Sequence, residues 1–157
     1  MLVRFTKNSP GAAADTLTCI RADGSITTGD MPRQGVLPHA AICYVVESTL
    51  GWRDAFFGSI ARGEKLKPQR KKTRRGENLC EQGQQADALV ECLEAGLWGG
   101  VSEPAAFEKS LRNACHQRTV PPPKFAGKEL EALRTALREF GAAWRPLNPG
   151  QSIERNF

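Results

Sequence analysis

Residues 37–52, LPHAAICYVVESTLGW, combine a helix start, a helical apolar pattern and a helix stop in one run. Pro38 suits the first turn of a helix because that position needs no amide donor, and Gly51 suits a left-handed cap at the end. The face that we predict to be buried consists of Ala41, Ile42, Val45, Val46, Thr49 and Leu50. We therefore predict a helix over 38–51 at the structural centre of the domain.

Short strands are predicted at both ends of the chain. Apolar and β-branched residues favour strands over 2–6, 16–21 and 25–28, and Asp23-Gly24 favours a tight hairpin between the last two. The tail 151–157 alternates Ile153, Arg155 and Phe157 on one side. A terminal segment of this kind is best stabilised at a sheet edge, so we predict that it joins the N-terminal strands as a fourth strand.

Helical periodicity continues after the central helix. We predict a short helix over 54–62 with Phe56, Phe57 and Ile60 turned inward, and longer helices over about 78–97 and 102–116. The last helix ends before Pro146, and its predicted core residues are Leu130, Leu133, Leu137, Phe140 and Trp144. The predicted fold class is α+β: residues 1–157 form a single domain in which a small antiparallel sheet, three N-terminal strands plus the C-terminal strand, packs with four or five helices.

Composition limits the function classes. A chain of 157 residues is long enough to bury one core, and no run approaches the roughly 18 apolar residues that span a bilayer. The N-terminus lacks the apolar region of a signal peptide. The five cysteines form no C-x-x-C pair, which favours buried, reduced thiols. We expect a cytoplasmic protein with no membrane partner.

His39, Cys43 and Glu47 recur every fourth residue and so line up along one side of the predicted helix. They could form a catalytic group, with a Cys-His nucleophile pair and a nearby carboxylate. His39 and Cys43 could also ligate a metal, and zinc is the ion that such ligands suit. The interpretation that we favour is structural: His39 packs or caps the helix start, Cys43 is core, Glu47 is a satisfied surface acid, and no cofactor is expected.

The same run resembles a family of small, uncharacterised bacterial proteins. The similarity lies in residues 37–51, in Phe56-Phe57-Gly58, and in Trp144-x-x-Leu147-x-Pro149-Gly150 followed by an alternating tail. In that family a Pro-His-Asp opens the helix, a second His follows one turn later, and a Val-Glu comes next. The resemblance implies the same α+β domain and brings no established activity.

This chain departs from the family pattern at two positions. Ala40 stands where the family has Asp, and Cys43 stands where it has the second His. The family pattern suggests a metal or acid/base pair. Cysteine can still ligate zinc, but the loss of the Asp removes a possible hydrogen-bond partner for the imidazole of His39. The departures weaken the enzyme hypothesis.

A basic segment, residues 65–75, holds seven cations and no acid. They are Lys65, Lys67, Arg70, Lys71, Lys72, Arg74 and Arg75. Taking these seven from the 22 Lys and Arg leaves 15 basic against 17 acidic groups, so the net charge of +5 is due to this segment. Its low apolar content predicts a mobile, solvated loop over 64–77. The cations could contact nucleic-acid phosphates or an acidic protein, although the segment has no aromatic residue to stack on bases; the alternative is a solvated insertion.

Two functional hypotheses follow. The first is a non-enzymatic binding or regulatory module that contacts an acidic partner or nucleic acid through the basic segment. The second is a metal-dependent, hydrolase-like enzyme centred on His39, Cys43 and Glu47.

Overall fold

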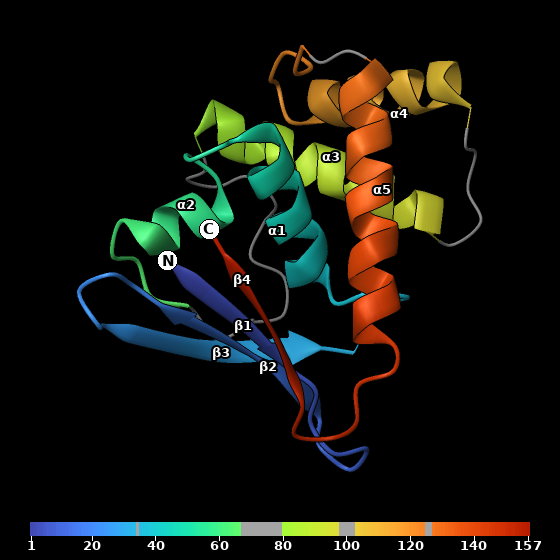
Figure 1. Ribbon diagram of the computed structural model, residues 1–157. Coiled ribbons are helices and arrows are strands. Elements are labelled where there is room, and N and C mark those ends of the chain that lie inside the picture. The colour runs from blue at the N-terminus through green and yellow to red at the C-terminus, as the bar shows by residue number, and fades with distance from the viewer. Residues whose placement is uncertain (34, 67–79, 98–102, 125–126) are drawn as a thin grey trace.

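Four antiparallel strands form one sheet in the order β3-β2-β1-β4 (Figure 1). The strands are β1 (Leu2–Thr6), β2 (Ala14–Ile20), β3 (Ile26–Pro32) and β4 (Ser152–Asn156). The computed structural model describes residues 1–33, 35–66, 80–97, 103–124 and 127–157. The predicted addition of the C-terminal strand is confirmed, because β4 pairs with β1 along its whole length.

One face of the sheet is apolar. Val3 and Phe5 alternate with outward residues on β1, and the register places Phe5 between Leu17 of β2 and Ile153 of β4. Strand β3 extends beyond the predicted 25–28, because its pairing with β2 continues to Pro32 and buries Met31. The helices lie over this apolar face (Figure 1).

Five helices complete the described fold, so the predicted α+β class is confirmed. They are α1 (His39–Leu50), α2 (Phe56–Ala61), α3 (Glu81–Leu97), α4 (Pro104–Gln117) and α5 (Gly127–Trp144). The predicted core residues of α5 are all buried, in keeping with their 3-4 spacing. The buried side chains of strands and helices belong to one hydrophobic cluster.

Helix α1 is central, as predicted. It contacts α2, α3, α5 and β3, and every residue from Ala41 to Glu47 is buried. The predicted buried face of α1 was too narrow. A helix that has neighbours on several sides buries residues on most of its circumference. The predicted face was also wrong at Thr49, which is exposed. Gly51 ends α1 at a φ of 66°, the left-handed conformation that glycine adopts without strain.

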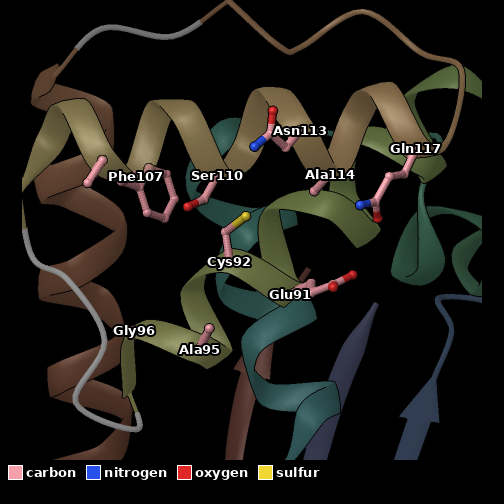
Figure 2. A pocket seen from close by; sticks show the side chains of 10 residues that line it. Glu91, Cys92, Ala95, Gly96, Phe107, Ser110, Asn113, Ala114 and Gln117 are labelled. Atoms are coloured by element: carbon pink, nitrogen blue, oxygen red, sulfur yellow. The ribbon is translucent and has the colours of Figure 1, made fainter.

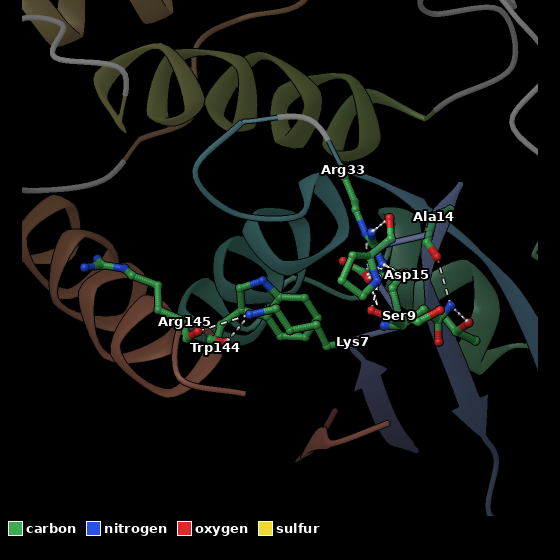
Figure 3. A network of polar contacts seen from close by, with 10 residues as sticks. Lys7, Ser9, Ala14, Asp15, Arg33, Trp144 and Arg145 are labelled. Atoms are coloured by element: carbon green, nitrogen blue, oxygen red, sulfur yellow. Dashed lines mark hydrogen bonds and ion pairs between the residues drawn. The ribbon is translucent and has the colours of Figure 1, made fainter. Parts of the chain in front are cut away.

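Two polar networks hold the strands to their surroundings (Figure 3). The Arg33 guanidinium donates to the buried carboxylate of Asp15 at 2.9 and 3.0 Å, and it also donates to the carbonyls of the 8–10 turn. The Lys7 ammonium donates to the carbonyl oxygen of Arg145 at 3.1 Å and to that of Trp144 at 3.5 Å. A cation at the C-terminal end of α5 satisfies carbonyls that have no partner within the helix.

Within the described residues, no helix has both the length and the apolar character needed to cross a membrane. All five cysteines are free thiols.

Candidate functional site

His39 lies in the first turn of α1 and faces α3. Its Nδ1 is 3.4 Å from Oε2 of Glu94, and the two side chains are 48% and 29% exposed. An ion pair between groups this accessible contributes little to stability, because water screens it. The structure thus places the predicted histidine at a helix–helix contact with one carboxylate partner.

Cys43, one turn further along α1, belongs to the core. Burial raises the pKa of its thiol well above the ordinary value, and the negative charges of Glu47, Asp87 and Glu94 raise it further. Nucleophilic attack and metal ligation both use the thiolate. The environment of Cys43 therefore favours the inert, protonated form.

Glu47 is not a surface acid, contrary to the sequence interpretation: its exposed fraction is 1%. Its Oε2 accepts hydrogen bonds from the backbone N–H groups of Phe57 at 2.9 Å and Gly58 at 3.1 Å, and its Oε1 accepts from Phe57 at 3.1 Å. Burial raises the pKa of Glu47 to about 7, and these amides oppose that rise. The carboxylate of α1 thereby holds the first turn of α2.

The Phe56-Phe57-Gly58 sequence completes this contact. A Cβ atom on Gly58 would lie 1.9 Å from the carbonyl oxygen of Arg53, so only glycine fits where the 53–58 turn closes on itself. The Glu47 and Phe-Phe-Gly elements of the family resemblance thus meet in space. Their joint geometry is that of a structural junction between α1 and α2.

Among the described residues, no three or more His, Cys, Asp or Glu side chains are arranged to hold a metal ion. His39 faces α3, Cys43 lies in the core, and the Glu47 carboxylate is occupied by the amides of α2. The metal and catalytic roles proposed for these residues stay predictions.

The basic segment is attached to the domain at both described flanks. Lys65 is exposed; Lys67, Arg70, Lys71, Lys72, Arg74 and Arg75 lie outside the described residues. On the N-terminal side, the N–H of Leu66 donates to the hydroxyl of Thr27 on β3 at 3.0 Å. The Arg21 guanidinium of the 21–25 turn also donates to the carbonyls of Ile60, at 2.5 Å, and Glu64.

The C-terminal flank of the basic segment is held at the turn before α2. The Gln82 side-chain oxygen accepts from the backbone N–H groups of Arg53 at 3.0 Å and Asp54 at 2.8 Å. The Cys80 thiol donates to the carbonyl of Asp54. The described residues on the two sides of the basic segment, 64–66 and 80–82, are therefore held by the 21–25 turn, by β3 and by the turn before α2.

Phe56 is exposed by 40%, so its predicted inward orientation is wrong. Phe57 and Ile60 do face the core. Neighbouring residues of a helix point about 100° apart. The buried side of α2 is the one that carries Phe57 and Ile60, so Phe56 lies beyond its edge.

A shallow cavity of about 380 Å³ opens between α3 and α4 (Figure 2). Figure 2 shows Cys92 of α3 and Ser110 of α4 pointing toward one another, and Glu91 and Asn113 also line the cavity. Burial raises the pKa of the Cys92 thiol to about 11, so this thiol is protonated at neutral pH. None of the predicted site residues lines the cavity, and no sequence motif marked it.

Comparisons of the chain with protein-family models, with curated proteins and with solved structures find no match. Function must therefore be inferred from this chain's own residues.

Proposed function

We propose that the protein is a cytoplasmic, non-enzymatic binding module that contacts nucleic acid through residues 65–75. The observation that carries the proposal is the concentration of seven cations, without an acid, in residues 65–75. The described residues on either side of this segment are held by β3, through Leu66, and by the turn before α2, through Gln82. An acidic protein is the competing partner.

The charge distribution favours a polyanionic partner. Seven cations within eleven residues match the dense phosphate charge of a nucleic acid. Lys and Arg are also the side chains that most often contact phosphate oxygens. The rest of the chain has slightly more acidic than basic groups, so the attraction would be local to the segment.

The geometry of α1 supports a binding role over a catalytic one. The Cys43 thiol is buried and protonated, and the Glu47 carboxylate is committed to the amides of Phe57 and Gly58. The Cys43 sulfur is enclosed in the core, and the Glu47 oxygens are hydrogen-bonded within the fold. His39 alone is accessible, beside Glu94.

Fluorescence anisotropy with a labelled single-stranded oligonucleotide, a labelled duplex and a labelled poly-glutamate peptide tests the proposal. One variant replaces Lys71, Lys72, Arg74 and Arg75 with Gln. A matched control replaces the exposed cations Lys109, Arg112, Lys124 and Lys128 with Gln. Removing four positive charges from +5 leaves +1 in both variants.

We expect the first variant to lose most of the nucleic-acid affinity and the matched control to keep it. Equal losses in the two variants would mean that only net charge matters and would contradict the role of the segment. Binding of poly-glutamate alone would assign the module to an acidic protein instead. Absence of binding to all three probes would reject the proposed function.

A further inference from the structure

Next to the α1–α2 junction, aromatic rings and one guanidinium from distant parts of the sequence contact one another. The Phe56 ring lies 5.0 Å from the ring of Phe57, and the Phe57 ring lies 5.7 Å from that of Phe157. The guanidinium carbon of Arg53 lies 4.4 Å from the centroid of Phe157. Three aromatic rings and one guanidinium are thus connected. The buried Phe57 lies between Phe56 on one side and the Arg53–Phe157 pair on the other.

Phe56 and the Arg53–Phe157 pair are accessible enough to contact a binding partner. Phe56 is exposed by 40%, and the Arg53 side chain is exposed where it stacks on the Phe157 ring. The buried Glu47 holds the first turn of α2 in the orientation that leaves Phe56 outside. The exposed part of the Phe56 ring is therefore available to a partner.

Exposed cations lie along the sequence on both sides of Phe56. Arg53, Arg62 and Lys65 are exposed on or next to α2. Asp54 pairs with Arg62 at 3.0 Å, which offsets one of these charges. Aromatic rings beside cations are the combination by which proteins hold unpaired nucleotides, because rings stack on bases while cations contact phosphates.

We propose that Phe56 and the Arg53–Phe157 stack form a platform for the unpaired bases of a single-stranded nucleic acid. This inference rests on the proposed function and names its partner. A duplex hides the faces of its bases in its own stack, so the platform favours single strands. It supplies the aromatic contact that residues 65–75 lack.

The test compares Phe56→Leu with Phe56→Tyr. Leucine keeps an apolar side chain on α2 but removes the aromatic ring on which a base could stack. Tyrosine keeps that ring. Val36→Ala is the matched control, because Val36 is 43% exposed in the segment before α1. Anisotropy is measured with labelled oligo-deoxythymidine and with a duplex of the same length, and thermal unfolding confirms that each variant is folded.

We expect Phe56→Leu to weaken oligo-deoxythymidine binding by roughly five- to a hundredfold, the factor that one stacked base contributes. Phe56→Tyr and Val36→Ala should bind like the unaltered protein, and duplex binding should not respond to Phe56→Leu. Unchanged single-strand binding in Phe56→Leu would overturn the platform. If the Lys71/Lys72/Arg74/Arg75 variant lost binding in the same assay, the proposed function would still stand. An unaltered protein that bound only poly-glutamate, or no probe, would also overturn the platform.

Discussion

Glu47 is a buried carboxylate that accepts hydrogen bonds from two backbone amides. Removing a carboxylate from water raises its pKa, while amide donors favour the charged form and lower it. Burial is the larger effect here and raises the pKa to about 7; the charge of Arg53 lowers it only in part. The native state therefore holds the Glu47 proton over a range in which the unfolded chain has released it.

The stability of the protein should fall as pH rises through that range. The native pKa of Glu47 is raised from 4.5 to about 7, so the contribution of its proton is fully present below about pH 4.5 and is lost by about pH 7. The loss is on the order of 3 kcal/mol in the free energy of unfolding. Urea unfolding across the window measures it.

Glu47→Gln is the control for this pH effect. The glutamine amide does not titrate, so the difference in unfolding free energy between the two proteins isolates the Glu47 proton from the other carboxylates. As pH rises from about 4.5 to about 7, we expect the unfolding free energy of the unaltered protein to fall relative to that of Glu47→Gln. A difference that is constant with pH would show that Glu47 has an ordinary pKa.

At the scale of elements, the α1–α2 junction depends on a close backbone approach at Gly58. Gly58→Ala would force a Cβ atom to within 1.9 Å of the Arg53 carbonyl, so the 53–58 turn must open and the Glu47 contact must move. We expect a loss of about 2–3 kcal/mol, typical of overpacking at a closed site. Denaturant unfolding, with the unaltered protein in parallel, gives the value.

Gly96→Ala is the matched substitution for Gly58→Ala. Gly96 is also helical, but a Cβ there meets nothing within 4 Å. Replacing a helical glycine that has free space should stabilise the protein by about 0.5–1 kcal/mol. Equal effects of the two substitutions would contradict the steric account of Gly58.

Elements were predictable from the sequence where local signals agreed with the fold. Gly51 and the 3-4 spacing of α5 identified helices because they act through neighbouring residues. Glu47 and Phe56 were misjudged because their environment depends on how α2 folds back on α1, which no local pattern encodes. The cavity between α3 and α4 is likewise a product of packing.

At the scale of the whole molecule, the sheet supports helices on its apolar face, and β3 provides one anchor for the basic segment. The other anchor is the turn before α2, which the junction with α1 holds in place. Folding therefore links the buried Glu47 to Gln82, a described residue that follows the basic segment. In the proposed function, phosphate contacts by residues 65–75 and base stacking on Phe56 are two separate contributions to affinity.

This arrangement predicts a specific salt dependence. For single strands, the logarithm of affinity falls with the logarithm of salt concentration by about 0.7 per phosphate contact. Neutralising Lys71, Lys72, Arg74 and Arg75 should therefore reduce the slope by up to about 3. The Lys109/Arg112/Lys124/Lys128 control should keep the slope of the unaltered protein.

Phe56→Leu should lower affinity at every salt concentration without changing the slope, because stacking releases no counterions. A slope that changed in Phe56→Leu, or in the control, would show that phosphates contact the domain elsewhere.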